Sequence, residues 1–281
     1  MKWLALVGLL LTVGCAVQNR QSLGPELAVA AGWHWESLPA GSFDLAVATK
    51  PGGQGRTLTV YIEGDGLAYV TPTERSMDPT PTDPVALRLA LSHPGDGPVA
   101  YLARPCQYPD RQRPRNCRDD YWSSARYAPE VVNSVNAALD QLKARTRSAD
   151  RLVLVGFSGG GALAALLAER RSDVVGLVTV AANLDLAQWV SVKKLTPLYA
   201  SLDPADQAGR LSDLPQVHFI GSEDAVVERS VLRAFLSQMR GDARVQTIEV
   251  AGQTHGCCWA DAWAGLARRG ELSVIPDWVR Q

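Results

Sequence analysis

Residues 156–160, Gly-Phe-Ser-Gly-Gly, place a serine between glycines at a junction that could display a nucleophile. A Leu/Val run over residues 151–157 precedes the junction, and a run of Gly, Ala and Leu to Glu169 follows it. A serine at a strand-to-helix turn is strained, and flanking glycines remove the Cβ atoms that would clash there. The helix N-terminus would aim N–H groups at a developing oxyanion. The pattern therefore predicts Ser158 as a nucleophile.

A serine at its ordinary pKa needs a general base, and the chain after Ser158 holds two histidines. His218 lies within residues 216–220, in the body of a predicted strand, which favours a packed or hydrogen-bonded side chain. His255 follows the last predicted strand in a loop flanked by glycines, residues 251–256. Such a loop can turn the imidazole toward the edge of a sheet, so we predict His255 as the base.

The base needs an acid to orient it, and the expected chain order is serine, acid, histidine. Residues 221–227 follow a predicted strand directly and place a carboxylate just beyond its carboxyl end. We predict Asp224 as this acid, with its neighbour Glu223 as the alternative. Asp261 follows the histidine and would break the order.

The elements around these residues alternate between strand-like and helical patterns, which is typical of a parallel α/β sheet. Residues 33–49 predict a β-hairpin, and an apolar face recurs at helical spacing over residues 129–145. Residues 183–210 interrupt the alternation and predict a short cap-like insertion over the carboxyl edge of the sheet. No composition break divides residues 31–281, which we predict to be one domain. Further strands are predicted at residues 57–62, 99–103, 151–157, 174–181, 216–220 and 245–250, and further helices at residues 83–91 and 160–169.

Three segments together resemble the α/β-hydrolase superfamily, in its serine esterase and lipase branch. Residues 156–160 match the nucleophile turn, residues 221–227 match a glycine-x-x-acid-x-x-valine segment, and residues 252–256 match the histidine loop. The resemblance covers the chain from about Trp33 to the C-terminus. Residues 62–66, Ile-Glu-Gly-Asp-Gly, and 104–108, Arg-Pro-Cys-Gln-Tyr, also resemble hydrolase-like lipoproteins of Gram-negative bacteria.

The resemblance implies a mostly parallel sheet flanked by helices and a serine hydrolase that cleaves carboxylic esters through an acyl-enzyme. The N–H of Gly159 and a second N–H, from Asp65 or Gly66, would form the oxyanion hole. Family members commonly carry His-Gly where this chain has Glu-Gly-Asp-Gly, and a carboxylate there would oppose an oxyanion unless it is paired or turned away. Thioesterase, peptidase and acyltransferase activities use the same groups, and a non-catalytic cell-envelope protein is the alternative from another class.

The implied chemistry needs no metal and no organic cofactor, and the substrate would be a small-molecule or lipid ester. Nucleic acid is not expected as a partner, because 28 basic residues balance 29 acidic ones and no concentrated positive face is indicated. Four aromatic residues are candidates either for an acyl or aryl pocket or for the core. These residues are Tyr121, Trp122, Trp259 and Trp263.

The N-terminus resembles the signal peptide of a bacterial lipoprotein. Lys2 precedes an apolar run, residues 3–13, that is too short to span a bilayer and ends at Gly14-Cys15. We therefore expect residues 1–14 to be a signal peptide, Cys15 to be acylated, and residues 15–30 to be a tether. Ala16 after the cysteine indicates the outer membrane, with the domain facing the periplasm. Thr12 departs from the pattern, and an ordinary cleaved signal peptide is the alternative.

Export changes the interpretation of the remaining four cysteines, because disulfides persist outside the cytoplasm. Cys106 and Cys117 bracket a short proline-containing loop, so we predict a disulfide between them. Cys257 and Cys258 are adjacent, and the sequence does not decide between a strained bond and two free thiols. A zinc site is the rival interpretation, but the spacings match no zinc-binding pattern.

Overall fold

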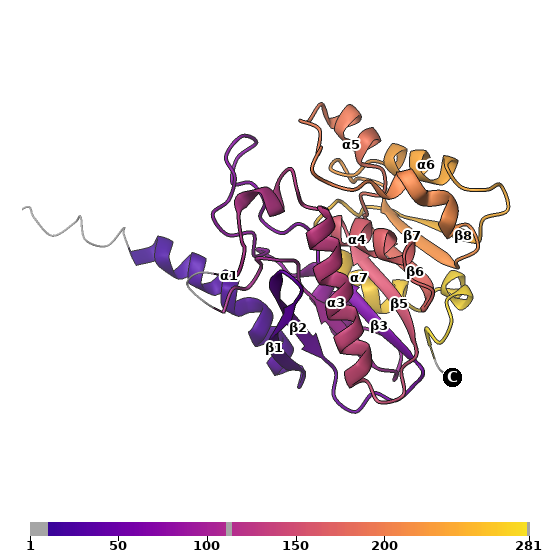
Figure 1. The fold of residues 1–281 in the computed structure, drawn as a ribbon, viewed down its shortest axis with the longest axis horizontal. Helices are drawn as coiled ribbons and strands as arrows, with labels where there is room; N and C mark the ends of the chain where they lie inside the picture. Colours follow the sequence, from indigo (N-terminus) through magenta and orange to yellow (C-terminus); the bar gives the residue numbers. More distant parts are fainter. Residues whose placement is uncertain (1–10, 111–113, 280–281) are drawn as a thin grey trace, which may run out of the picture.

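The computed structural model describes residues 11–110 and 114–279, and for residues 11–19 it describes the backbone alone. Within these residues one sheet of eight strands forms the centre of the molecule, in the order β1-β2-β4-β3-β5-β6-β7-β8 (Figure 1). Strands β1 and β2 form the predicted hairpin, β2 runs antiparallel to β4, and the other neighbours are parallel. The strands are β1 (His34–Ala40), β2 (Phe43–Thr49), β3 (Thr57–Ile62), β4 (Val99–Leu102), β5 (Arg151–Phe157), β6 (Val174–Val180), β7 (Gln216–Gly221) and β8 (Val245–Val250).

Helices cover both faces of the sheet, so the central strands are buried on both sides (Figure 1). One face packs against α3 (Pro129–Arg145), α4 (Gly159–Ala168) and α6 (Arg229–Ser237). The other packs against α1 (Leu11–Ala30), α2 (Val85–Leu91) and α7 (Trp259–Leu266). Because helices cover both faces, every residue of β3 and β4 is buried, whichever face of the sheet its side chain occupies. The predicted α/β architecture is confirmed. Three 3-10 helices complete the described chain: η1 (Asp119–Trp122), η2 (Pro204–Leu211) and η3 (Gly270–Val274).

The expected cap-like insertion, residues 183–210, contains α5 (Leu186–Lys193) and most of η2. Asp203 joins its two parts, because its carboxylate accepts the N–H groups of Leu186 and Ala187 at the start of α5 and that of Ala205 at the start of η2. Helix α5 packs beside α6, at the end of the sheet where the strands β5 to β7 finish (Figure 1).

Residues 20–30, which we expected to form part of a tether, lie in helix α1 and contact the folded body. Helix α1 runs to Ala30, and Arg20 pairs with Asp78 at 3.2 Å. Gly24 packs so closely that a Cβ there would lie 2.8 Å from Tyr108. Gly24 and the buried Ala28 are four residues apart and share one helix face, and their small size allows this approach.

The predicted signal peptide lies mostly outside the described residues, which begin at Leu11. Cys15 lies within α1, in the part for which the structure describes the backbone alone. Among residues 11–110 and 114–279, none of the helices combines the length and the apolar character needed to cross a membrane.

Candidate active site

Ser158 occupies a strained turn between β5 and α4. Its φ of 50° and ψ of −123° lie where side chains other than glycine are rarely found. A Cβ at Gly156 would lie 2.4 Å from the carbonyl oxygen of Gly160, and one at Gly160 would lie 2.2 Å from that of Ile62. Glycine is therefore required on both sides of the serine, because strand and helix pass too closely for any side chain. This is the turn that the sequence predicted.

The structure brings together the three predicted residues Ser158, His255 and Asp224. Oγ of Ser158 lies 2.9 Å from Nε2 of His255, and Nδ1 of His255 lies 2.9 Å from Oδ2 of Asp224. The three side chains follow β5, β8 and β7, whose carboxyl ends meet at one edge of the parallel sheet. Such a chain can carry a proton from the hydroxyl to the imidazole while the carboxylate stabilises the resulting charge.

The choice between Asp224 and Glu223 follows from burial and hydrogen bonding. Asp224 is 8% exposed, and its Oδ1 accepts the N–H groups of Val226 and Val227, both at 2.8 Å. Glu223 is exposed and contributes only its backbone N–H, to the carbonyl of Gln253. The neighbouring carboxylates therefore have different roles, and Asp224 is the one directed at the imidazole.

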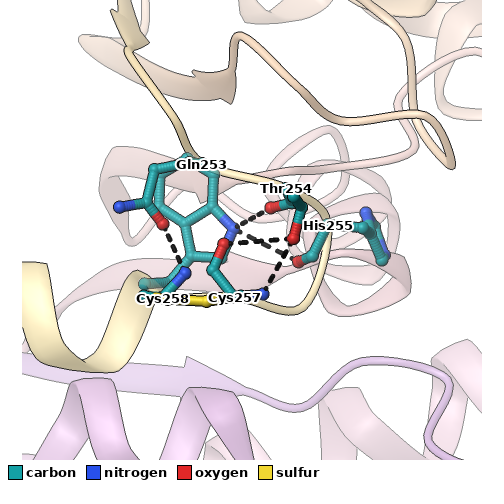
Figure 2. The surroundings of a disulfide bond; sticks show 6 residues. Gln253, Thr254, His255, Cys257 and Cys258 are labelled. Atoms are coloured by element: carbon teal, nitrogen blue, oxygen red, sulfur yellow. Dashed lines mark hydrogen bonds between the residues drawn. A yellow bond between two sulfur atoms is a disulfide. The ribbon is translucent and has the colours of Figure 1, made fainter.

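His255 lies in a loop that its own hydrogen bonds close (Figure 2). The N–H of Thr254 donates to the carbonyl of Cys257 at 2.9 Å, and the N–H of Cys258 donates to Oε1 of Gln253 at 2.6 Å. The indole N–H of the buried Trp259 donates to the carbonyls of Thr254 and His255. These contacts fix the loop from below and leave the imidazole directed at the serine.

Cys257 and Cys258 are joined to each other in the structure, as Figure 2 shows. Only Gly256 separates the pair from His255, and both cysteines are exposed. Of the two possibilities that the sequence left open, the structure has the bond.

Asp65 lies beside the serine turn, and its carboxylate is fully paired. Oδ1 accepts from Nη1 of Arg104 and Oδ2 from Nη1 of Arg126, each at 2.5 Å. Burial opposes ionisation of Asp65, but the charges of Arg126 and Arg104 hold its pKa below the ordinary value. A Cβ on Gly159 would lie 2.1 Å from Oδ1 of Asp65, so this carboxylate packs directly against the start of α4. The charge at this position is therefore neutralised by two guanidinium groups.

Four backbone N–H groups near Ser158 can be compared as oxyanion donors. The N–H of Gly64 already donates to Oε1 of Glu63 at 2.9 Å. Those of Asp65 and Gly66 have no hydrogen-bond acceptor among the residues that the structure describes. The N–H of Gly159 opens α4, where the first N–H groups of a helix have no partner within it. Gly159, Asp65 and Gly66 therefore remain the candidates, as the sequence predicted.

Glu63 is a buried acid that directly precedes Gly64 and Asp65. Its Oε1 also accepts the N–H of Ala86 at 3.3 Å, and burial raises its pKa to about 7.

His218 is buried elsewhere, in β7, where it forms a hydrogen bond with Oγ1 of Thr179 at 2.8 Å. Burial lowers the pKa of His218 to about 3, so the packed histidine that the sequence favoured is confirmed.

A cavity of about 390 Å³ opens over Ser158 and His255. Its wall combines polar and apolar side chains. Polar members such as Arg126 and Asn183 were not found by sequence reasoning, because no motif marks them. The four aromatic residues considered for the pocket are buried in the core and do not line this cavity. Side chains that line it include Glu63, Asp65, Tyr69, Asp83, Val85, Arg126, Phe157, Asn183, Trp189, Val226 and Val227.

The profile of the serine hydrolase family FSH1 matches residues 100–255, which is more than half of the chain. The chain belongs to this family. The matched segment contains Ser158, Asp224 and His255, whereas residues 62–66 precede it. No curated protein matches this FSH1 serine hydrolase.

Solved structures share the α/β-hydrolase fold of the FSH1 serine hydrolase. The Pyrococcus furiosus esterase Pf2001 has a TM-score of 0.60 at 12% identity, over 88% of this chain and 93% of its own. The esterase domain of a Rhodothermus marinus protein has a TM-score of 0.56 at 13% identity, over 83% and 94%. A bacterial membrane phospholipase A has a TM-score of 0.56 at 15% identity, over 97% and 98%. At these identities the likeness shows the fold.

The segment Arg104–Tyr108 of the FSH1 serine hydrolase supports the residues beside Ser158. Gln107 is buried; its Oε1 accepts the N–H of Arg104, and its Nε2 donates to the carbonyl of Gly64 at 2.9 Å. Cys106, next to it, is bonded to Cys117 in the structure. The two sequence segments that resembled lipoprotein hydrolases therefore contact each other, and one holds the other in place.

Within residues 11–110 and 114–279, no group of three or more His, Cys, Asp or Glu side chains is arranged to hold a metal ion.

Proposed function

We propose that this FSH1 serine hydrolase cleaves carboxylic esters with Ser158 as nucleophile, His255 as base and Asp224 as the orienting acid. The observation that carries the proposal is the continuous hydrogen-bonded chain from Oγ of Ser158 through both ring nitrogens of His255 to Asp224. A hydroxyl is a poor nucleophile until such a base removes its proton.

The reaction follows from this order of groups. Oγ of Ser158 attacks the ester carbonyl carbon while its proton moves to Nε2 of His255. The imidazolium then protonates the departing alcohol, which leaves an acyl-enzyme on Ser158. Water then attacks the carbonyl carbon of the acyl-enzyme while His255 takes its proton. The imidazolium returns this proton to Oγ of Ser158 as the bond between Oγ and the acyl carbon breaks and the carboxylic acid departs.

The tetrahedral intermediate needs hydrogen-bond donors for its oxyanion. In the proposed site the N–H of Gly159 supplies one donor, and the N–H of Asp65 or Gly66 supplies the second. Arg104 and Arg126 neutralise the Asp65 carboxylate, which removes the repulsion that an unpaired charge would exert on the oxyanion.

Esters are favoured over thioesters and peptides because two of the similar structures are named as esterases. Thioesterase, peptidase and acyltransferase activities require the same three side chains, so the substrate must be tested directly. A fluorophosphonate probe, which reacts with activated serines, and a series of p-nitrophenyl esters of rising chain length would do so. We expect labelling and ester turnover in the wild type and neither in Ser158→Ala, with the same melting temperature for both. Labelling of folded Ser158→Ala at the wild-type rate would refute the proposal.

We further propose that the protein is attached to the outer membrane through acylated Cys15, facing the periplasm. The junction Gly14-Cys15 after a short apolar run supports this, since acylation holds a protein at a membrane without a spanning helix. Metabolic labelling with a clickable palmitate analogue tests it. Wild type should take up the label and Cys15→Ser should not; equal labelling of the two, or none in the wild type, would refute the anchor.

A further inference from the structure

Asn183 is a buried polar side chain without a partner, at the edge of the proposed active site. It follows β6, it is 2% exposed, and its backbone N–H faces the carbonyl of Ser158 at 3.4 Å. Neither Oδ1 nor Nδ2 has a hydrogen-bond partner among the residues described. The residue lines the same cavity as Ser158 and His255. Its carboxamide is therefore adjacent to the place where an ester would bind.

An unpartnered buried carboxamide is costly, and such groups in native proteins are rare. Within residues 11–110 and 114–279 the Asn183 side chain caps no helix and forms no hydrogen bond with another side chain, so the fold alone does not compensate the burial of its carboxamide. A bound ligand can supply the missing partners. The carboxamide offers both an acceptor oxygen and N–H donors, and a hydroxyl group can satisfy both because it donates and accepts.

The neighbouring wall of the cavity is also suited to oxygen-bearing groups. Arg126 uses Nη1 for Asp65 and Nε for the carbonyl of Ser123, while its Nη2 has no acceptor in the described chain. Trp189 lies 5.8 Å from the Arg126 guanidinium, and its indole N–H is held by the carbonyl of Val226. Both side chains line the cavity. A plain alkyl chain would leave Nη2 of Arg126 and the carboxamide of Asn183 unpaired, whereas a hydroxylated group could pair with them.

We propose that Asn183 is a specificity-determining residue that binds a hydroxyl group close to the scissile bond, so that the preferred substrates are small hydroxylated esters. This inference rests on the proposed esterase function. The cavity of about 390 Å³ lies within the range of sites for small molecules. The hydroxyl belongs either to the acyl part or to the alcohol part of the ester, and the two cases are separated by experiment.

Two matched pairs of esters test the proposal. The acyl side is tested with p-nitrophenyl 3-hydroxybutyrate against p-nitrophenyl butyrate, and the alcohol side with glycerol 1-monobutyrate against propyl butyrate. A site built to bind a hydroxyl rejects the analogue that lacks it, so we expect a kcat/KM ratio of about tenfold or more in one pair. In Asn183→Leu the ratio should fall to about one to threefold.

Stability provides a second readout. Asn183→Leu removes an unpaired polar group, so its melting temperature should equal or exceed that of the wild type. Asn183→Ala is the reserve variant, and the same fall in the ratio is expected of it. The matched control is Ser230→Ala, which removes another buried unpartnered oxygen, away from the cavity. This control should leave both ratios and the fluorophosphonate labelling unchanged.

The outcomes separate this inference from the function on which it rests. A wild type that is not labelled by fluorophosphonate would refute the esterase proposal itself. A labelled wild type that shows no preference in either pair would overturn the hydroxyl inference alone. Retention of the preference in both Asn183 variants, or an equal loss on the two members of a pair, would also overturn it, because Asn183 would then not contact the hydroxyl.

Discussion

The carboxylate of Asp224 lies 2.9 Å from Nδ1 of His255 and is held there by two backbone N–H groups of the following turn. One oxygen faces the imidazole and the other faces the backbone, so the side chain cannot rotate away without losing hydrogen bonds. The neighbouring Glu223 points to solvent. The orientation of the imidazole therefore depends on one carboxylate of an adjacent pair.

Replacement of this carboxylate should remove most of the activity. Asp224→Asn keeps an oxygen for the N–H groups of Val226 and Val227 but stabilises the wrong imidazole tautomer, so kcat should fall by about 10⁴. Steady-state kinetics on a p-nitrophenyl ester measure the effect. Glu223→Gln is the matched control and should remain near wild type. A large loss in Glu223→Gln with little in Asp224→Asn would reverse the assignment.

The paired carboxylate of Asp65 should be important for stability. Asp65→Asn leaves the buried guanidinium groups of Arg104 and Arg126 without a counter-charge, which should lower the free energy of unfolding by roughly 3–5 kcal/mol. Urea denaturation measures this. Asp150→Asn removes the partner of Arg56 in an exposed ion pair and should change stability little, because solvent screens such pairs. Equal stability of Asp65→Asn and wild type would contradict the account.

Glu63 should make stability depend on pH. Burial raises its pKa from 4.5 to about 7 in the folded state, so the folded protein retains a proton that the unfolded chain releases. Its contribution is fully present below pH 4.5 and is lost as pH rises through about 7, by on the order of 3 kcal/mol. Glu63→Gln cannot titrate, so it should gain stability relative to wild type over this range and no further above it.

Comparing the wild type with Glu63→Gln isolates the pH dependence that is due to Glu63. His93 and His218, whose pKa values burial lowers to about 4 and about 3, give the opposite slope, but they do so in both proteins. Urea denaturation at several values between pH 4 and pH 8 gives the difference. A difference in unfolding free energy that stays constant across this range would show that folding does not raise the pKa of Glu63.

The two disulfides should differ in their effect on stability. The bond between Cys106 and Cys117 closes a loop between residues 11 apart, and its loss in the double serine variant should cost roughly 3 kcal/mol. The bond between the adjacent Cys257 and Cys258 closes almost no loop, so their double serine variant should lose much less. Thermal denaturation compares the variants, and mass spectrometry of non-reduced peptides checks both bonds. Free thiols at Cys106 and Cys117 would refute the first pairing.

Local pattern was sufficient to predict the features that depend on neighbours in the chain. The glycines around Ser158 signal a tight turn because strand and helix cross within a few residues, and the structure has that turn. Strand β3 has the bounds that its β-branched residues indicated, and helix α3 has those that its apolar periodicity indicated. His255 and Asp224 were predicted because parallel strands end at one edge, so order along the chain indicates proximity in space.

The sequence thus determined the sheet, the turn and the three side chains that meet at its edge, while the tertiary structure decided what surrounds them. Asp65 is paired with Arg104 and Arg126, which are 39 and 61 residues away, and no spacing rule joins positions so distant. The docking of α1 through Gly24 depends on the shape of Tyr108, not on the pattern of the helix itself. The side chain of Asn183 has no hydrogen-bond partner among the described residues, and this depends on how the chain packs around it. Hydrophobic periodicity and glycine placement are local properties, whereas pairing and burial arise only when distant segments pack together.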